Sequence, residues 1–109
     1  MMKLRNKKDF TRVIIDVLPV DLKNQLVREF GIHSDDIDVL QSDSNKEEFY
    51  IGIPYSYTYY KKVRTTLAVI HIADNELISI EGGYHSRKKT SSITVRELLE
   101  GYASYKNLY

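Results

Sequence analysis

Apolar residues at helical spacing mark the beginning of the chain. They recur at intervals of three and four, as on one face of an amphipathic helix: Phe10, Val13, Ile14, Val17 and Leu18. Asn6 is a suitable N-cap for this predicted helix, and Pro19 must stop or kink it. The alternative is a strand over 12–18, "RVIIDVL", because Val and Ile favour strands.

A second helix is predicted to follow Pro19, because proline is well suited to the first turn of a helix. Its apolar stripe would consist of Leu22, Leu26, Val27 and Phe30. Gly31 is a natural left-handed C-cap. The pattern therefore predicts two consecutive helices with a bend between them.

After Gly31 the period changes to two, which is typical of strands. Residues 37–40 and 49–53 flank the polar turn "SDSNK" and predict a first hairpin. Residues 63–73 and 76–84, joined by Asp74 and Asn75, predict a second one. The expected core face of this second hairpin holds Ala68, Ile70, Ile72, Ile78 and Ile80.

The last element is a helix that begins with a T-x-x-E capping box, Thr94 and Glu97. One face then carries Val95, Leu98, Leu99, Tyr102 and Tyr105, while Gly101 weakens the helix by about 1 kcal/mol relative to alanine. Together these patterns predict an α+β fold for residues 1–109 as a single domain. It would have two N-terminal helices, a four-stranded antiparallel sheet of two hairpins and a C-terminal helix, with the helices on one face.

Composition limits the chemistry. Cysteine is absent, which excludes disulfides, thiolate nucleophiles and Cys-based metal sites. His33 and His71 have no metal-ligand spacing, and Asp36 and Asp38 lack the glycine of a calcium loop, so no metal or cofactor is expected. No long apolar run is present, which predicts a cytoplasmic chain with no membrane contact.

The net charge is only +1, but the charges are segregated along the chain. Residues 1–12 contain five basic residues and one acidic residue, whereas residues 13–48 contain three basic and nine acidic ones. This segregation predicts one basic and one acidic face.

The stretch "PYSYTYYKKVRTT", residues 54–66, is the first candidate site, because it combines tyrosines with basic residues and contains no acid. In an extended strand, Tyr55, Tyr57 and Tyr59 would share one face, followed by Lys61, Lys62 and Arg64. Stacking rings beside a basic groove are how single-stranded nucleic acid is held without sequence preference. Two alternatives remain open: half-buried strand tyrosines, and anchors of a protein interface.

A basic loop after Gly82 is the second candidate for nucleic-acid or partner binding. It presents Tyr84, Arg87, Lys88 and Lys89, and Arg87 is suited to a bidentate phosphate contact. The plain alternative is a solvated connection. A third interpretation is a small metal-independent ribonuclease, with Tyr84 or His85 moving protons and Arg87 or Lys88 stabilising charge on the phosphate.

An acidic stretch offers a different class of function. Its acids would form a negative surface that occupies the nucleic-acid groove of another protein: Asp35, Asp36, Asp38, Asp43, Glu47 and Glu48. The alternative is an ordinary solvated hairpin.

No phosphate-binding loop, dinucleotide motif or serine-hydrolase elbow is present in the sequence, and no catalytic residue is predicted. The leading hypothesis is therefore a small non-enzymatic protein that binds nucleic acid, with single strands preferred, or a nucleic-acid–protein complex. The runner-up is an inhibitor or adaptor that binds a protein, including a nucleic-acid-binding protein, and a homodimer is compatible with the pattern.

Overall fold

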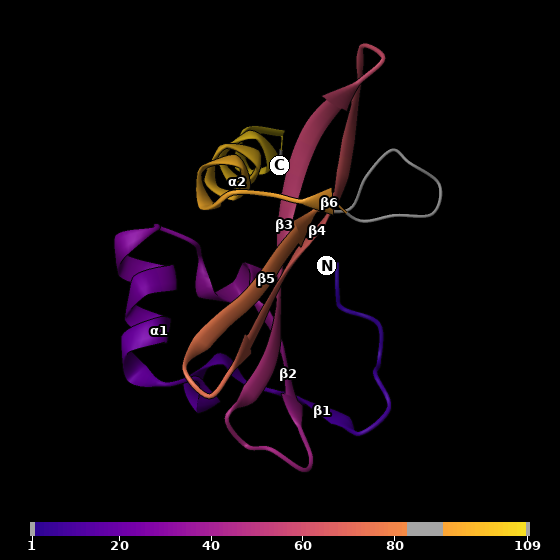
Figure 1. Cartoon of the computed structure of the whole chain (residues 1–109). Coiled ribbons are helices and arrows are strands. Elements are labelled where there is room, and N and C mark those ends of the chain that lie inside the picture. Colours follow the sequence, from indigo (N-terminus) through magenta and orange to yellow (C-terminus); the bar gives the residue numbers. More distant parts are fainter. Residues whose placement is uncertain (1, 83–90, 109) are drawn as a thin grey trace.

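The computed structural model describes residues 2–82 and 91–108. Its strands form one antiparallel sheet, in which they lie side by side in chain order (Figure 1). The strands are β1 (Phe10–Val13), β2 (Asp38–Ser42), β3 (Glu48–Tyr59), β4 (Lys62–Ala73), β5 (Glu76–Gly82) and the two-residue β6 (Ser91–Ser92). The helices are α1 (Val20–Asn24), which continues as a π-helical turn over Gln25–Glu29, and α2 (Val95–Leu108). Short 3₁₀ turns cover Ile15–Val17 and Ser34–Asp36. The α+β class with an antiparallel sheet and a C-terminal helix is confirmed.

Both predicted hairpins are present, and the sheet has two further short strands: β1, part of which the strand alternative covered, and β6, which was not expected. β3 and β4 pair over twelve residues each, from Glu48 opposite Ala73 to Tyr59 opposite Lys62. The turn between β4 and β5 is Asp74–Asn75, with φ values of 52° and 65°. Asn and Asp tolerate this left-handed conformation, which explains why the turn was legible in the sequence.

The predicted helix from Asn6 to Leu18 is wrong. Its middle, Phe10–Val13, is strand β1, paired with β2 from Phe10 opposite Ser42 to Val13 opposite Val39, and Ile15–Val17 is a 3₁₀ turn. The strand alternative is correct for Arg12 and Val13. Long-range pairing with β2 outweighs the local helical spacing, as tertiary context often does for short β-branched segments. The side chain of Ile14, which belongs to the predicted apolar stripe, is 69% exposed.

The second predicted helix forms as α1 and its π-helical continuation. Pro19 stands just before the first helical residue, and Leu26 is buried against the sheet. Gly31 has a φ of +70°, which confirms the predicted left-handed ending.

One residue of the predicted core face is misplaced. Ile78 is 57% exposed, whereas Ala68, Ile70 and Ile80 are buried. The register between β4 and β5 shifts after His71, so that His71 lies opposite Ser79 and Ile72 opposite Leu77. Ile78 is the extra residue of this bulge, and no periodic pattern marks a bulge in advance.

The outer edge of β5 is covered only in part. Among the described residues, β6 pairs with Glu81 and Gly82 alone, and the backbone N–H of Ile93 donates to the carbonyl of Ile80. Glu76–Ser79 has no strand neighbour on that side in the described ranges, and it carries the exposed side chains of Leu77 and Ile78.

The core lies between one face of the sheet and the helices, as predicted (Figure 1). Leu26 of the π-helical turn and Leu98 of α2 pack in one cluster with Ile51 and Ile53 of β3. At the start of α2, the Thr94 hydroxyl accepts from the Glu97 N–H (3.0 Å) and the Glu97 carboxylate accepts from the Thr94 N–H (3.1 Å). The predicted capping box is therefore confirmed.

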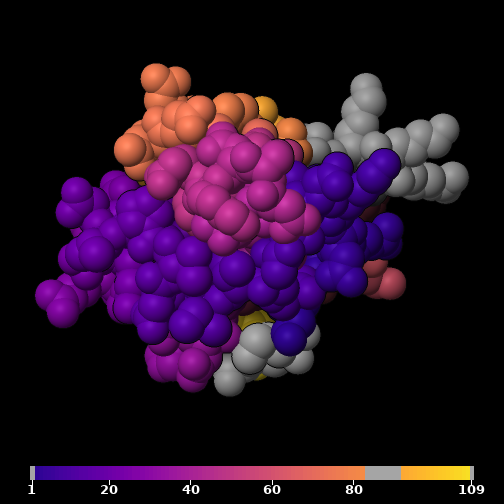
Figure 2. All heavy atoms as spheres, turned by 90° about the horizontal axis from the view of Figure 1, so that it is seen from below, coloured from indigo at the N-terminus to yellow at the C-terminus, as the bar shows by residue number. Residues whose placement is uncertain are grey.

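The N-terminal segment, residues 2–8, lies on the opposite face of the sheet from α1 (Figures 1 and 2). Leu4 is buried on this face. It packs directly over Gly52, where any side chain would collide with it. The Leu4 N–H donates to Asp38 Oδ2 (2.7 Å), and Arg12 donates to both Asp38 oxygens (2.9 and 3.1 Å) and to the Leu4 carbonyl. The side-chain hydrogen bonding of Arg12 to Asp38 raises the pKa of Arg12. The N-terminal segment is thus fixed to the sheet by one buried carboxylate.

Candidate functional site

The end of the β3–β4 pair, residues 57–64, is the candidate site and is called the distal hairpin below. It extends beyond the end of α2 (Figure 1), and among the described residues only β3 and β4 form it, because β5 pairs with β4 from Ala68 onward. Its turn, Tyr60–Lys61, has φ values of 49° and 61°. Two positive φ angles define a type I′ turn, for which Asn-Gly is the usual sequence.

Aromatic and basic side chains alternate across the distal hairpin. Tyr57 lies opposite Arg64, and Tyr59 lies opposite Lys62, so each ring shares a face with a cation. The rings of Tyr59 and Tyr60 have centroids 4.2 Å apart at 52°. A hydrogen bond between the two hydroxyls is the main cause that raises the pKa of Tyr59. Tyr60, which the sequence analysis did not select, is 82% exposed.

The predicted row of tyrosines is divided by the fold. Tyr55 is only 5% exposed, because its ring fills the space between Gly82 of β5 and Gly101 of α2. It therefore fits the alternative interpretation of a packed strand tyrosine. Tyr57 is half-buried at the margin of the core, and its ring centroid lies 5.7 Å from that of Tyr55. Tyr59 and the neighbouring Tyr60 are at the end of the hairpin.

The surface beside Tyr57 is acidic. A hollow of about 410 Å³ between β3 and α2 is lined by Tyr57, Ser104 and the carboxylates Glu97 and Glu100. Like charges repel a phosphate backbone, so this hollow disfavours nucleic acid along the helix side of β3. The basic end of the hairpin, from Tyr59 to Arg64, lies outside that hollow.

The predicted acidic surface is largely engaged in holding the fold together. Asp38 binds Leu4 and Arg12, and Glu48 Oε2 lies 2.8 Å from His71 Nε2. Asp43 accepts a hydrogen bond from the Thr11 hydroxyl. Asp35, Asp43 and Glu47 remain exposed, and the acidic interface stays a prediction.

Asp36 also has an internal role, since it holds α2 against the turn at Ser34–Asp36. The Tyr102 hydroxyl donates to Asp36 Oδ2 (2.7 Å) and accepts from the His33 N–H (2.9 Å), and Lys106 Nζ lies 3.1 Å from the same carboxylate oxygen. Burial, followed by the hydrogen bond to Asp36, raises the pKa of Tyr102 to about 12.

We therefore expect Tyr102→Phe to lower the free energy of unfolding by about 1–3 kcal/mol near neutral pH, because the His33 N–H and the Asp36 carboxylate lose their partner. The pKa of tyrosine in an unfolded chain is about 10, below that of folded Tyr102, so the folded state favours the protonated form. The difference between the two proteins should be full below about pH 10 and decline towards pH 12. Urea unfolding at several pH values measures it, and a difference that grows over this range would contradict the assignment.

Sequence reasoning missed a second basic region on the open face of the sheet. Lys3, Arg5 and Lys7 of the N-terminal segment line a groove with Tyr50, and Lys7 Nζ lies 4.3 Å from the centre of the Tyr50 ring. Tyr50 stacks on His71, with ring centroids 4.2 Å apart. The excess of bases in residues 1–12 was the available signal, but no local pattern indicates that this segment lies against the sheet.

Part of the predicted site cannot be compared with the structure. The basic-loop residues Tyr84, His85, Arg87, Lys88 and Lys89 lie outside the described residues. Their proximity to the distal hairpin stays a prediction, as does the ribonuclease interpretation based on them.

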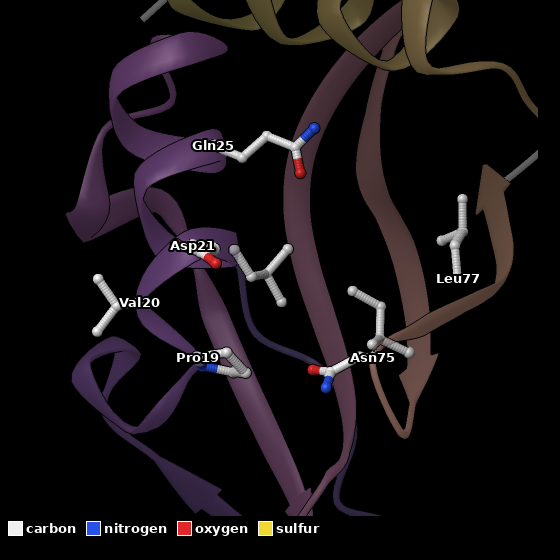
Figure 3. A pocket seen from close by; sticks show the side chains of 8 residues that line it. Pro19, Val20, Asp21, Gln25, Asn75 and Leu77 are labelled. Atoms are coloured by element: carbon white, nitrogen blue, oxygen red, sulfur yellow. The ribbon is translucent and has the colours of Figure 1, made fainter.

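A further cleft lies between α1 and the β4–β5 turn, with a volume of about 540 Å³ (Figure 3). Gln25 points from the helix side towards the sheet, and Leu77 stands on β5. Asp21 is the only titratable group among the eight lining residues, so the cleft offers no acid–base pair. Within the described ranges, no three His or acidic residues are grouped as metal ligands, and no helix is long and apolar enough to span a bilayer.

The distal hairpin is therefore a part of the described structure where the exposed ring of Tyr60 and the half-buried ring of Tyr59 lie beside exposed cations. Comparisons of the chain with protein-family models, curated protein sequences and solved structures find no match, so the functional argument depends on this geometry alone.

Proposed function

We propose that this chain is a small non-catalytic protein that binds nucleic acid, preferentially single-stranded, through the distal hairpin. The observation that carries the proposal is the combination, at one end of the hairpin, of the Tyr59–Tyr60 ring pair with the exposed cations Lys61, Lys62 and Arg64 and no acid. Bases stack on exposed rings and phosphates attract the cations, which is the general way in which single strands are bound.

The conformation of the turn also supports the proposal. Residues other than glycine, asparagine and aspartate are costly at positive φ, by about 1–2 kcal/mol each. Tyr60 and Lys61 both occupy such positions. Backbone strain of this kind clusters at functional sites.

The turn allows a test in which unfolding cannot explain a loss of binding. The double variant Tyr60→Asn/Lys61→Gly removes a ring and a cation but installs the preferred type I′ sequence, so its stability should equal or exceed that of the wild type. We expect wild-type protein to bind labelled oligothymidylate, measured by fluorescence anisotropy, and the variant to bind about 10- to 100-fold more weakly. Single-stranded RNA and duplex DNA are titrated alongside.

The matched control is the turn at the other end of β4. Asp74→Asn/Asn75→Gly installs the same two residues in the same backbone conformation, and it should leave nucleic-acid binding unchanged. Absence of binding by wild-type protein even at low salt, or equal affinity of the Tyr60→Asn/Lys61→Gly variant, would refute the proposal. The first of these results would direct attention to a protein partner.

A further inference from the structure

The groove between the N-terminal segment and the open sheet face is a second site of positive charge. It has a volume of about 800 Å³ and its floor includes Leu67 and Val69 of β4 and Tyr50 of β3. The N-terminal segment forms its wall, with three cations, Lys3, Arg5 and Lys7, against the single carboxylate of Glu81. A concave surface lined mainly by one sign of charge concentrates ions of the opposite sign.

The backbone that carries these cations is held against the sheet at Leu4 and Asn6. Leu4, between Lys3 and Arg5, is buried and hydrogen-bonded to Asp38, and Arg12 Nη1 donates to Asn6 Oδ1 (3.0 Å). The backbone that carries the cations is therefore positioned before any ligand arrives, which lowers the entropy lost on binding.

The groove is within reach of a strand that contacts the distal hairpin. Arg64 and Val69 are five residues apart on β4, or about 17 Å at strand spacing. The distal hairpin is two strands wide in the described structure, so a strand at its tip can pass over it to the open face. We infer that this groove binds the phosphate backbone of the same nucleic acid whose bases contact the distal hairpin, an inference that rests on the proposed function.

The inference predicts that affinity rises with oligonucleotide length more steeply than it would if the distal hairpin were the only binding site. Oligothymidylates of about 4 to about 16 nucleotides, the range of site sizes in single-strand-binding folds, are titrated at several salt concentrations. For Lys3→Ala/Arg5→Ala, we expect near wild-type affinity for the shortest strand and about tenfold weaker binding of the longest at ~0.1 M salt. The salt slope for the longest strand should fall by about 1.4, which corresponds to two lost phosphate contacts.

Arg28→Ala/Lys46→Ala is the charge-matched control, because both residues are exposed and neither lines the groove. It should retain the wild-type dependence on length and salt. A second variant tests whether the groove must be positioned or whether positive charge alone is sufficient. Asp38→Asn makes the protein more positive but weakens the hydrogen bonds that hold Leu4 and Arg12. If the positioned groove matters, this folded variant binds the longest strand more weakly than wild type; tighter binding would overturn the inference.

The remaining outcomes distinguish the two proposals. Absence of wild-type binding at every length overturns the proposed function together with the groove. Wild-type binding that Tyr60→Asn/Lys61→Gly weakens, but that is unchanged in Lys3→Ala/Arg5→Ala at every length, overturns the groove and leaves the hairpin site.

Discussion

Replacing Gly101 with alanine should lower the free energy of unfolding by about 3 kcal/mol, although alanine is the better helix former. A Cβ at this position would lie 2.9 Å from the Cβ and 3.0 Å from the Cγ of Tyr55, and closer still to its Cδ2. These atoms are at the base of the ring, where rotation about χ1 gives little relief because Tyr55 is buried. Overpacking of a tight contact costs more than the roughly 1 kcal/mol that the helix gains.

Chemical denaturation followed by circular dichroism measures this change. Asn107→Ala, at an exposed position of the same helix, should shift stability by less than about 0.5 kcal/mol. A double-mutant cycle with Tyr55→Ala adds a second criterion, because the collision disappears when the ring is removed and the two losses should not add. Increased stability of Gly101→Ala would show that the helix and β3 are not in close contact.

Asp38→Ala should also cost about 3 kcal/mol, because one carboxylate satisfies the Leu4 N–H and the Arg12 guanidinium together. The loss belongs at the lower end of the range for buried ion pairs, since the Arg12 side chain is 32% exposed. Asp43→Ala is the control: this exposed acid on the neighbouring turn accepts only a hydroxyl bond at the surface, and its removal should cost less than about 1 kcal/mol.

Amide hydrogen exchange adds a local readout for Asp38. In wild-type protein the Leu4 amide should be protected, and in the Asp38→Ala variant it should exchange at the rate of an open chain. Equal stability losses for Asp38→Ala and Asp43→Ala, with Leu4 still protected, would mean that the N-terminal segment is held by other contacts.

Local signals in the sequence predicted the elements that local chemistry determines. The Thr94–Glu97 capping box, the left-handed Gly31 and the Asp74–Asn75 turn each depend on a few adjacent residues, and all three are present. The first strand was mistaken for a helix because its identity depends on pairing with β2, about 30 residues away. No periodic pattern contains that information.

The candidate site was predicted less well than the fold, for a related reason. Alternation correctly places Tyr55, Tyr57 and Tyr59 on one face of β3, but it does not say which face the helices cover. The helices cover the face that carries the tyrosines, so Tyr55, whose ring packs against Gly101 of α2, is buried in the core. The acids of the predicted negative surface form long-range contacts that have no local signal in the sequence. The hydrogen bond between Asp36 and Tyr102, for example, links residues 66 positions apart.

The incomplete outer edge of β5 has a consequence for the protein at high concentration. In the described part of the chain, this edge has no strand partner over residues 76–79 and carries the exposed apolar side chains of Leu77 and Ile78. Strand edges of this kind are templates for pairing between molecules and for fibril growth. The bulge at Ile78 interrupts the regular spacing of hydrogen-bonding groups that such stacking requires. The bulge that leaves Ile78 outside the core thus also makes this edge a poorer template for another strand.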